Sequence, residues 1–171
     1  QTPLHGALVA SAGTIVVAAY RWIVERLVRD GSLPSTARER EVLAAGAMEL
    51  ENTWEERVPQ EMRGYMGKMR EESAGRALST ERVGARLERI CRQAEAIAAN
   101  ATVHLDEAER ALDALRGRAG VEAFPAVPDA WQDLAVAWVR YLRNRYSMFD
   151  LAFELGWEPE LLEFLSTRRT S

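Results

Sequence analysis

Histidine and cysteine are almost absent from this chain of 171 residues, which contains only His5, His104 and Cys91. Zinc sites of the common types need several Cys or His ligands. A ferritin-like di-metal site needs a glutamate three residues before a histidine, and Ala101 holds that position before His104. One cysteine forms no intrachain disulfide, which fits a reducing compartment. We therefore expect no metal, no cofactor and a cytoplasmic location.

Recognisable catalytic patterns are missing as well. Cys91 and His104 fall on one predicted helix, where about 20 Å separates their backbones, too far for a nucleophile and its base. Neither the Walker A motif nor the glycine pattern of dinucleotide-binding sites occurs. Enzymatic activity stays an open question, but these absences favour a non-enzymatic role.

Long hydrophobic runs and an excess of positive charge are also lacking. The most apolar stretch, residues 7–20, has 14 residues, whereas roughly 20 are needed to span a bilayer. The net charge of -4 gives no general attraction for nucleic acid. We therefore expect no nucleic-acid partner and disfavour a membrane role. The alanine- and arginine-rich composition is typical of a high-GC bacterium.

What the sequence does contain is helical periodicity, interrupted by proline and glycine and without sustained period-two alternation. It predicts an all-α fold, a single-domain bundle of five to six helices over residues 1–171. The predicted helices cover residues 8–30, 37–58, 60–77, 80–116 and 129–155, with a short last helix from Pro159. The chain begins with Gln1 rather than methionine, which leaves room for earlier residues in the native protein.

The predicted helix over residues 80–116 is the most informative segment, because it would extend about 55 Å. Its apolar stripe, called the seam below, has three- and four-residue spacing and consists of Val83, Leu87, Ile90, Ala94, Ile97, Ala101, Leu105, Ala108, Leu112 and Leu115. Small residues such as Ala94 and Ala101 let another helix approach closely. Two consecutive four-residue steps around Ala101 resemble a stutter that locally unwinds a supercoil.

A basic face lies beside the seam, formed by Arg82, Arg86 and Arg89. Together with the seam it predicts a surface for a partner protein or for a second copy of the chain. The alternative is that these arginines are solvated or pair with the glutamates of the preceding helix, which are Glu49, Glu51, Glu55 and Glu56.

A second candidate site combines two other helices. Arg145 falls on the apolar face of the predicted helix 129–155, where a charged group needs a carboxylate or water. Flexible methionines share one face of the glycine-containing helix 60–77. The residues predicted to line a pocket for an acidic small-molecule ligand are Arg145, Trp138, Tyr141, Tyr146, Met62, Met66 and Met69. The structural alternative is an internal ion pair of Arg145 and a methionine-filled core.

Three functions are compatible with these patterns. The first is a non-enzymatic interaction or assembly module that uses the long helix. The second is a ligand-sensing regulatory domain with a pocket near Arg145, and the third is a membrane-active bundle that releases residues 8–28. The seam distinguishes among them: if it is buried within one chain, the long helix is the spine of a monomeric bundle.

Overall fold

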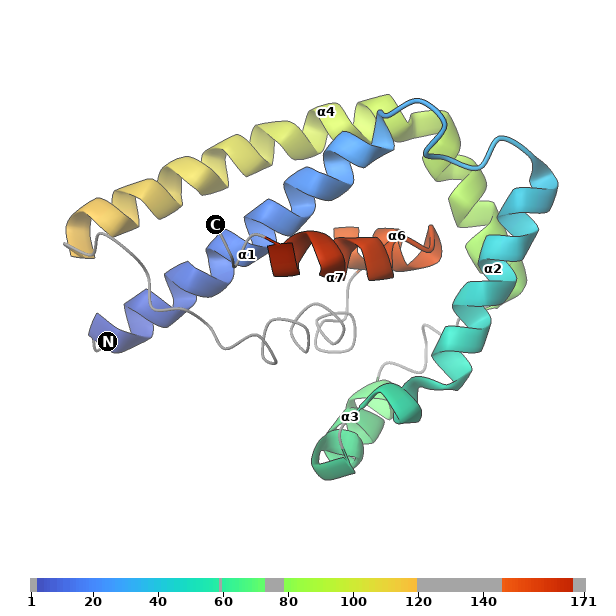
Figure 1. Ribbon diagram of the computed structural model, residues 1–171, viewed down its shortest axis with the longest axis horizontal. Helices are drawn as coiled ribbons and strands as arrows, with labels where there is room; N and C mark the ends of the chain where they lie inside the picture. The colour runs from blue at the N-terminus through green and yellow to red at the C-terminus, as the bar shows by residue number, and fades with distance from the viewer. Residues whose placement is uncertain (1–2, 59, 73–78, 120–145, 168–171) are drawn as a thin grey trace.

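The computed structural model describes residues 3–58, 60–72, 79–119 and 146–167, and within them it is all helical, as predicted (Figure 1). No strand occurs in these ranges. The elements are α1 (Pro3–Leu27), α2 (Ala37–Asn52), the 3-10 helix η1 (Trp54–Arg57), α3 (Gln60–Glu72), α4 (Thr80–Ala119), α6 (Met148–Glu154) and α7 (Glu158–Thr167).

The 40-residue helix α4 forms the spine of the molecule. One part of it runs antiparallel to α1 and the other lies along α2, and these are the two most extensive helix contacts (Figure 1). The short helices α6 and α7 pack against α1, and α6 also contacts α2. In Figure 1, α3 lies at the end of the molecule away from α1.

The seam of α4 is buried largely within this one chain. Its buried members are Val83, Leu87, Ile90, Ala94 and Leu105. Four more, Ile97, Ala101, Ala108 and Leu112, are partly buried and pack against the main hydrophobic core. This core also contains Ile23 and Leu27 of α1 and Ala44 and Ala47 of α2. Side chains of the same chain therefore fill most of the seam, and α4 is an internal spine.

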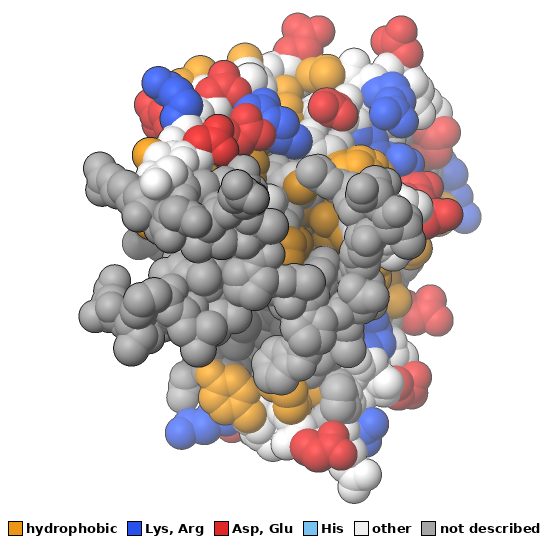
Figure 2. All heavy atoms as spheres, turned by 60° about the vertical axis from the view of Figure 1, so that its left-hand side comes forward, with side chains coloured by type: hydrophobic (Ala, Val, Ile, Leu, Met, Phe, Trp, Pro, Cys, Tyr) orange, Lys and Arg blue, Asp and Glu red, His pale blue; other side chains and the backbone are white. Residues whose placement is uncertain are grey.

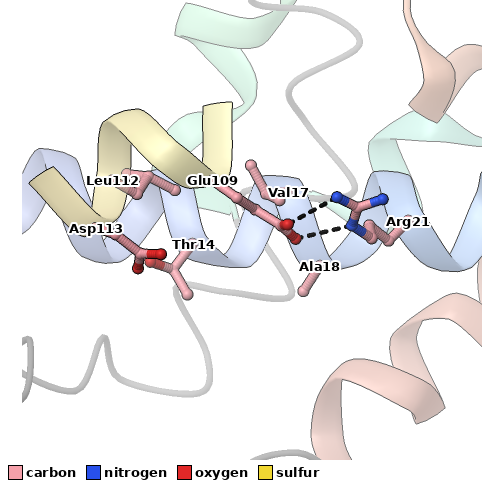
Figure 3. A pocket seen from close by; sticks show the side chains of 7 residues that line it. All are labelled: Thr14, Val17, Ala18, Arg21, Glu109, Leu112 and Asp113. Atoms are coloured by element: carbon pink, nitrogen blue, oxygen red, sulfur yellow. Dashed lines mark hydrogen bonds and ion pairs between the residues drawn. The ribbon is translucent and has the colours of Figure 1, made fainter. Parts of the chain in front are cut away.

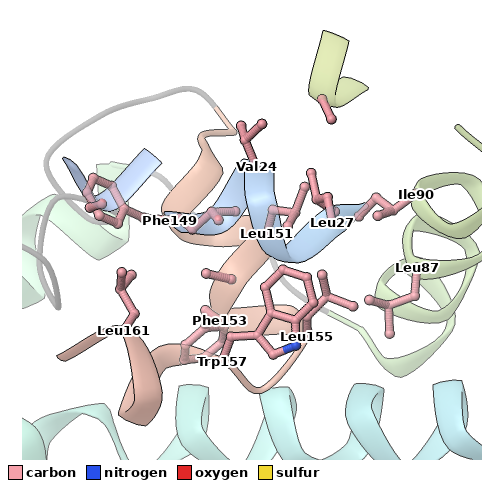
Figure 4. Packing of buried hydrophobic residues seen from close by; sticks show 14 of the residues in the cluster. Val24, Leu27, Leu87, Ile90, Phe149, Leu151, Phe153, Leu155, Trp157 and Leu161 are labelled. Atoms are coloured by element: carbon pink, nitrogen blue, oxygen red, sulfur yellow. The ribbon is translucent and has the colours of Figure 1, made fainter. Parts of the chain in front are cut away.

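Helix α6 supplies the centre of the core. Its residues from Phe149 to Glu154 are all buried. Phe153, Leu155 and Trp157 lie between the ribbons of α1 and α2 (Figure 4). The buried side chains of this short helix therefore fill the space between α1 and α2.

Local capping interactions define the start of α2 and the end of α6. Thr36 and Glu39 form the capping box of α2: the Glu39 N–H donates to Thr36 Oγ1 at 3.1 Å, and the Thr36 N–H donates to Glu39 Oε2 at 3.0 Å. Gly156 ends α6 with a φ of 71°. The N–H of Trp157 then donates to the Ala152 carbonyl at 2.8 Å, which completes a Schellman motif.

Several predicted helix limits are wrong by a few residues. Helix α1 spans Pro3–Leu27 rather than 8–30, and the Ser32 hydroxyl donates to the carbonyls of Arg26 and Arg29 near its end. Helix α2 ends at Asn52 rather than 58, where the Thr53 hydroxyl donates to the Glu49 carbonyl at 3.0 Å. At the C-terminal end of each of these two helices, a hydroxyl side chain binds backbone carbonyls and so competes with continuation of the helix.

The larger correction concerns the predicted helix 129–155, which cannot be continuous because α6 begins only at Met148. Ser147 is extended, and its N–H and hydroxyl donate to Asp150 Oδ2 at 2.7 and 2.8 Å. These bonds start a new helix at this point. Residues 129–145 and the predicted end of the third helix at residue 77 lie outside the described residues.

No helix in the described ranges is both long enough and apolar enough to cross a membrane.

Candidate functional site

The most unusual polar arrangement in the described residues is a buried carboxylate, Glu154, at the end of α6. Its side chain is 2 % exposed. Arg86 of α4 binds it with two bonds, Nη2 to Oε1 at 2.6 Å and Nε to Oε2 at 3.1 Å. The hydroxyl of Tyr146 donates to Oε2 at 2.9 Å. We call Glu154, Arg86 and Tyr146 the Glu154 cluster.

Burial and charge act in opposite directions on this cluster. Burial raises the pKa of Glu154, while the charge of Arg86 and the hydrogen bonds from Tyr146 and Arg86 counteract that rise without cancelling it. The pKa of Tyr146 is also raised, first by burial of its hydroxyl group and then by the Glu154 charge. The Arg86 guanidinium lies 4.8 Å from the centre of the Tyr146 ring, in a cation–π contact.

The Glu154 cluster divides the basic face that the sequence predicted. Arg86 is only one-third exposed and turns toward α6, whereas Arg82 and Arg89 are exposed. Sequence reasoning missed Glu154, although a glutamate inside the apolar segment 149–157 was a signal for a buried acid in need of a cation.

The predicted methionine face lies in a second, smaller core. Met66 is fully buried with Trp54 and Val58, and Met62 packs against them as a partly buried residue. Tyr65 is 57 % exposed on the same helix. We call this group of five residues the α3 end.

The structure describes only some of the residues predicted to line a ligand pocket. Tyr146 belongs to the Glu154 cluster, so it is not grouped with Met62 and Met66 of the α3 end. Trp138, Tyr141 and Arg145 lie outside the described residues, as does the side chain of Met69. The proposed partner residues of the seam are not open surface either, since Ala94 is buried and Ala101 is partly buried.

A pocket of about 250 Å³ opens between α1 and α4 (Figure 3). Its lining residues are Thr14, Val17, Ala18, Arg21, Glu109, Leu112 and Asp113. Arg21 binds Glu109 with bonds of 2.8 and 2.7 Å and Asp106 at 2.5 Å. These bonds raise the pKa of Arg21, and the bond from Arg21 lowers the pKa of Glu109.

This pocket is a weak candidate for a ligand-binding site. Ligand pockets usually enclose roughly 300–1,000 Å³, and the Arg21 guanidinium is already engaged by two carboxylates of its own chain. We interpret Arg21 as an ion-pair link between α1 and α4. In the described part of the chain, no group of three or more His, Cys, Asp or Glu residues is placed to hold a metal ion.

Two further ion pairs tie α7 to the rest of the molecule. Arg26 of α1 pairs with Glu160 and lies 5.0 and 5.2 Å from the rings of Trp22 and Trp157. Arg57 of η1 pairs with Glu158, which is buried. On the face shown in Figure 2, charged side chains of both signs are interspersed.

No family model matches this chain, and no curated protein or solved structure is significantly similar to it. Its function therefore has to be inferred from its own geometry.

Proposed function

We propose that this chain is a non-enzymatic helical interaction module that binds a partner protein through the α3 end. The supporting observation is a small core, separate from the main one, that leaves Tyr65 57 % exposed beside the partly buried Met62. Tyrosine and methionine are enriched at protein interfaces, where a rigid aromatic ring and a flexible thioether provide contact area.

The burial of the seam is the reason for placing the partner at the α3 end. A face that already packs on α1 and α2 would have to unpack before it could bind another helix. Arg82 and Arg89 remain exposed beside it, but Arg86 is held by Glu154. In this proposal, the long helix α4 supports the bundle, and the partner contacts the α3 end.

Charge favours a basic amphipathic helix as the partner. Three exposed glutamates, Glu55, Glu56 and Glu61, belong to η1 and the start of α3. Among the nearby cations, Arg57 is paired with Glu158, and Arg63 donates to the Val58 carbonyl at 3.1 Å. Opposite charges around an apolar contact increase association rates and fix orientation, and helices commonly bind apolar surfaces through one face.

The probe for this proposal is a short synthetic helix with leucines on one face and lysines on the other. NMR chemical-shift changes are expected at the α3 end. The substitution Tyr65→Ser is expected to weaken binding about tenfold, the effect of losing one moderate interface contact of about 1.4 kcal/mol.

Val103→Ser is the matched control, because Val103 is also 57 % exposed but lies on α4. This variant should bind the lysine peptide with unchanged affinity. The proposal is contradicted if the shift changes map to α4, if both variants bind alike, or if a glutamate-faced peptide binds as tightly as the lysine-faced one.

A further inference from the structure

The Glu154 cluster connects parts of the chain that are far apart in sequence. Arg86 comes from α4, Glu154 ends α6, and Tyr146 lies just before α6. All three bonds converge on one carboxylate, so they share a single acceptor group. A change in the charge of that carboxylate would therefore alter every polar contact of the cluster at once.

We propose that the Glu154 cluster is a proton-operated latch that joins α4 to both ends of α6. When Glu154 is ionised, it holds Arg86 and Tyr146 together. When a proton binds to the carboxylate, Arg86 loses its anionic partner and, being one-third exposed, can turn toward water. Tyr146 is 43 % exposed as a whole, so it can also leave without unpacking the main core. The latch is independent of the α3 end.

The charges around the cluster are consistent with this behaviour. Asp150, one turn earlier on α6, adds a second negative charge that favours protonation of Glu154. Four charged groups on α1, α2 and α7 interact with other residues: Arg21 binds Asp106 and Glu109, Arg26 binds Glu160, Glu158 binds Arg57, and the Arg40 charge acts on Cys91. Among the described residues, Arg86 is the cation that opposes protonation of Glu154.

The opening of the latch is expected under mildly acidic conditions. Burial raises the pKa of Glu154 above that of an ordinary glutamate, which is about 4.3. The Arg86 Nε–H resonance in NMR spectra reports on the bond to Glu154 directly. We expect this resonance to have the chemical shift of a carboxylate-bonded guanidinium at pH 7 and to move to that of a solvated arginine on acidification, with the same midpoint as the Glu154 side-chain carboxyl resonance.

Two variants separate the latch from general acid unfolding. Tyr146→Phe removes a bond that lowers the Glu154 pKa, so the midpoint should move to higher pH. Glu163→Gln, an exposed acid on α7, should leave it unchanged. An Arg86 Nε–H chemical shift that stays unchanged down to pH 4, or an unchanged midpoint in Tyr146→Phe, would overturn the proposal. The same pH-dependent shift change in Glu154→Gln, which lacks the titrating carboxyl, would overturn it too.

Discussion

Replacing Arg86 by methionine is expected to destabilise the chain by about 3 kcal/mol at pH 7. This lies at the lower end of the roughly 3–5 kcal/mol range for a broken buried ion pair, because Arg86 is 33 % exposed while Glu154 is 2 % exposed. The loss comes from leaving an ionised carboxylate buried without its cation, rather than from the attraction of the pair itself.

The destabilisation should depend on pH in a defined direction. Removing Arg86 removes an influence that lowers the Glu154 pKa, so the pKa in the folded variant rises further above its unfolded value. The folded variant then binds a proton more tightly than the unfolded chain does. The penalty is therefore fully present above the folded pKa and disappears as pH falls toward the unfolded value.

Urea denaturation of the two chains at pH 7 and at pH 5 measures this effect. Arg89→Met is the matched control, since Arg89 is exposed on the same helix, and a change within about 0.5 kcal/mol is expected for it. Equal effects of the Arg86 and Arg89 substitutions at pH 7 would show that the Glu154 pair contributes nothing.

Phe153→Ala is expected to cost about 3–5 kcal/mol, the usual range for deleting a buried aromatic side chain. Phe153 is 2 % exposed and is the largest of the almost fully buried side chains. It lies in the main core, where α6 contacts both α1 and α2. A cavity there would loosen the packing of both longer helices on α6.

Phe164→Ala provides the comparison for that prediction. Phe164 is partly buried on α7 and stacks on Trp22 with ring centres 6.0 Å apart. Removing this partly buried ring leaves a smaller cavity than removing the Phe153 ring. The decrease in the free energy of unfolding should therefore be clearly smaller than for Phe153→Ala. A larger loss for Phe164 than for Phe153 would contradict the position of α6 at the centre of the core.

Much of the fold could be predicted from the sequence because its signals are local. The seam, the Thr36–Glu39 capping box and Gly156 each depend on residues within a few turns of one another, and all three are present in the structure. Helical periodicity and capping are properties of short segments. For this reason the fold class and the long helix α4 are confirmed.

The start of a new helix at Ser147 has a local signal in the sequence, but a second pattern in the same segment favours a continuous helix. Continuous apolar spacing favoured one helix through Ser147 and into Met148, but the Ser147–Asp150 bonds start a new one. A serine followed three residues later by an acid is itself a capping pattern. Choosing between the two patterns required knowledge of which side chains the core would bury.

The partners that meet in the Glu154 cluster and in the small core of the α3 end could not be predicted, because these contacts depend on tertiary packing. Arg86 and Glu154 are 68 residues apart, and no periodicity within either helix indicates that they meet. Likewise, the pairing of Trp54 with Met66 depends on the turn between η1 and α3. The contacts that distinguish a buried ion pair from a solvated one are set by the fold as a whole.

Light scattering over a wide concentration range is the most direct test of whether the seam is filled within one chain. If α4 is an internal spine, the molar mass should stay at the 19.2 kDa of a single chain from micromolar to millimolar concentration. A mass that rises toward that of a dimer, and returns to the monomer value on substitution of Ala101 by glutamate, would contradict it. The seam would then be an assembly surface.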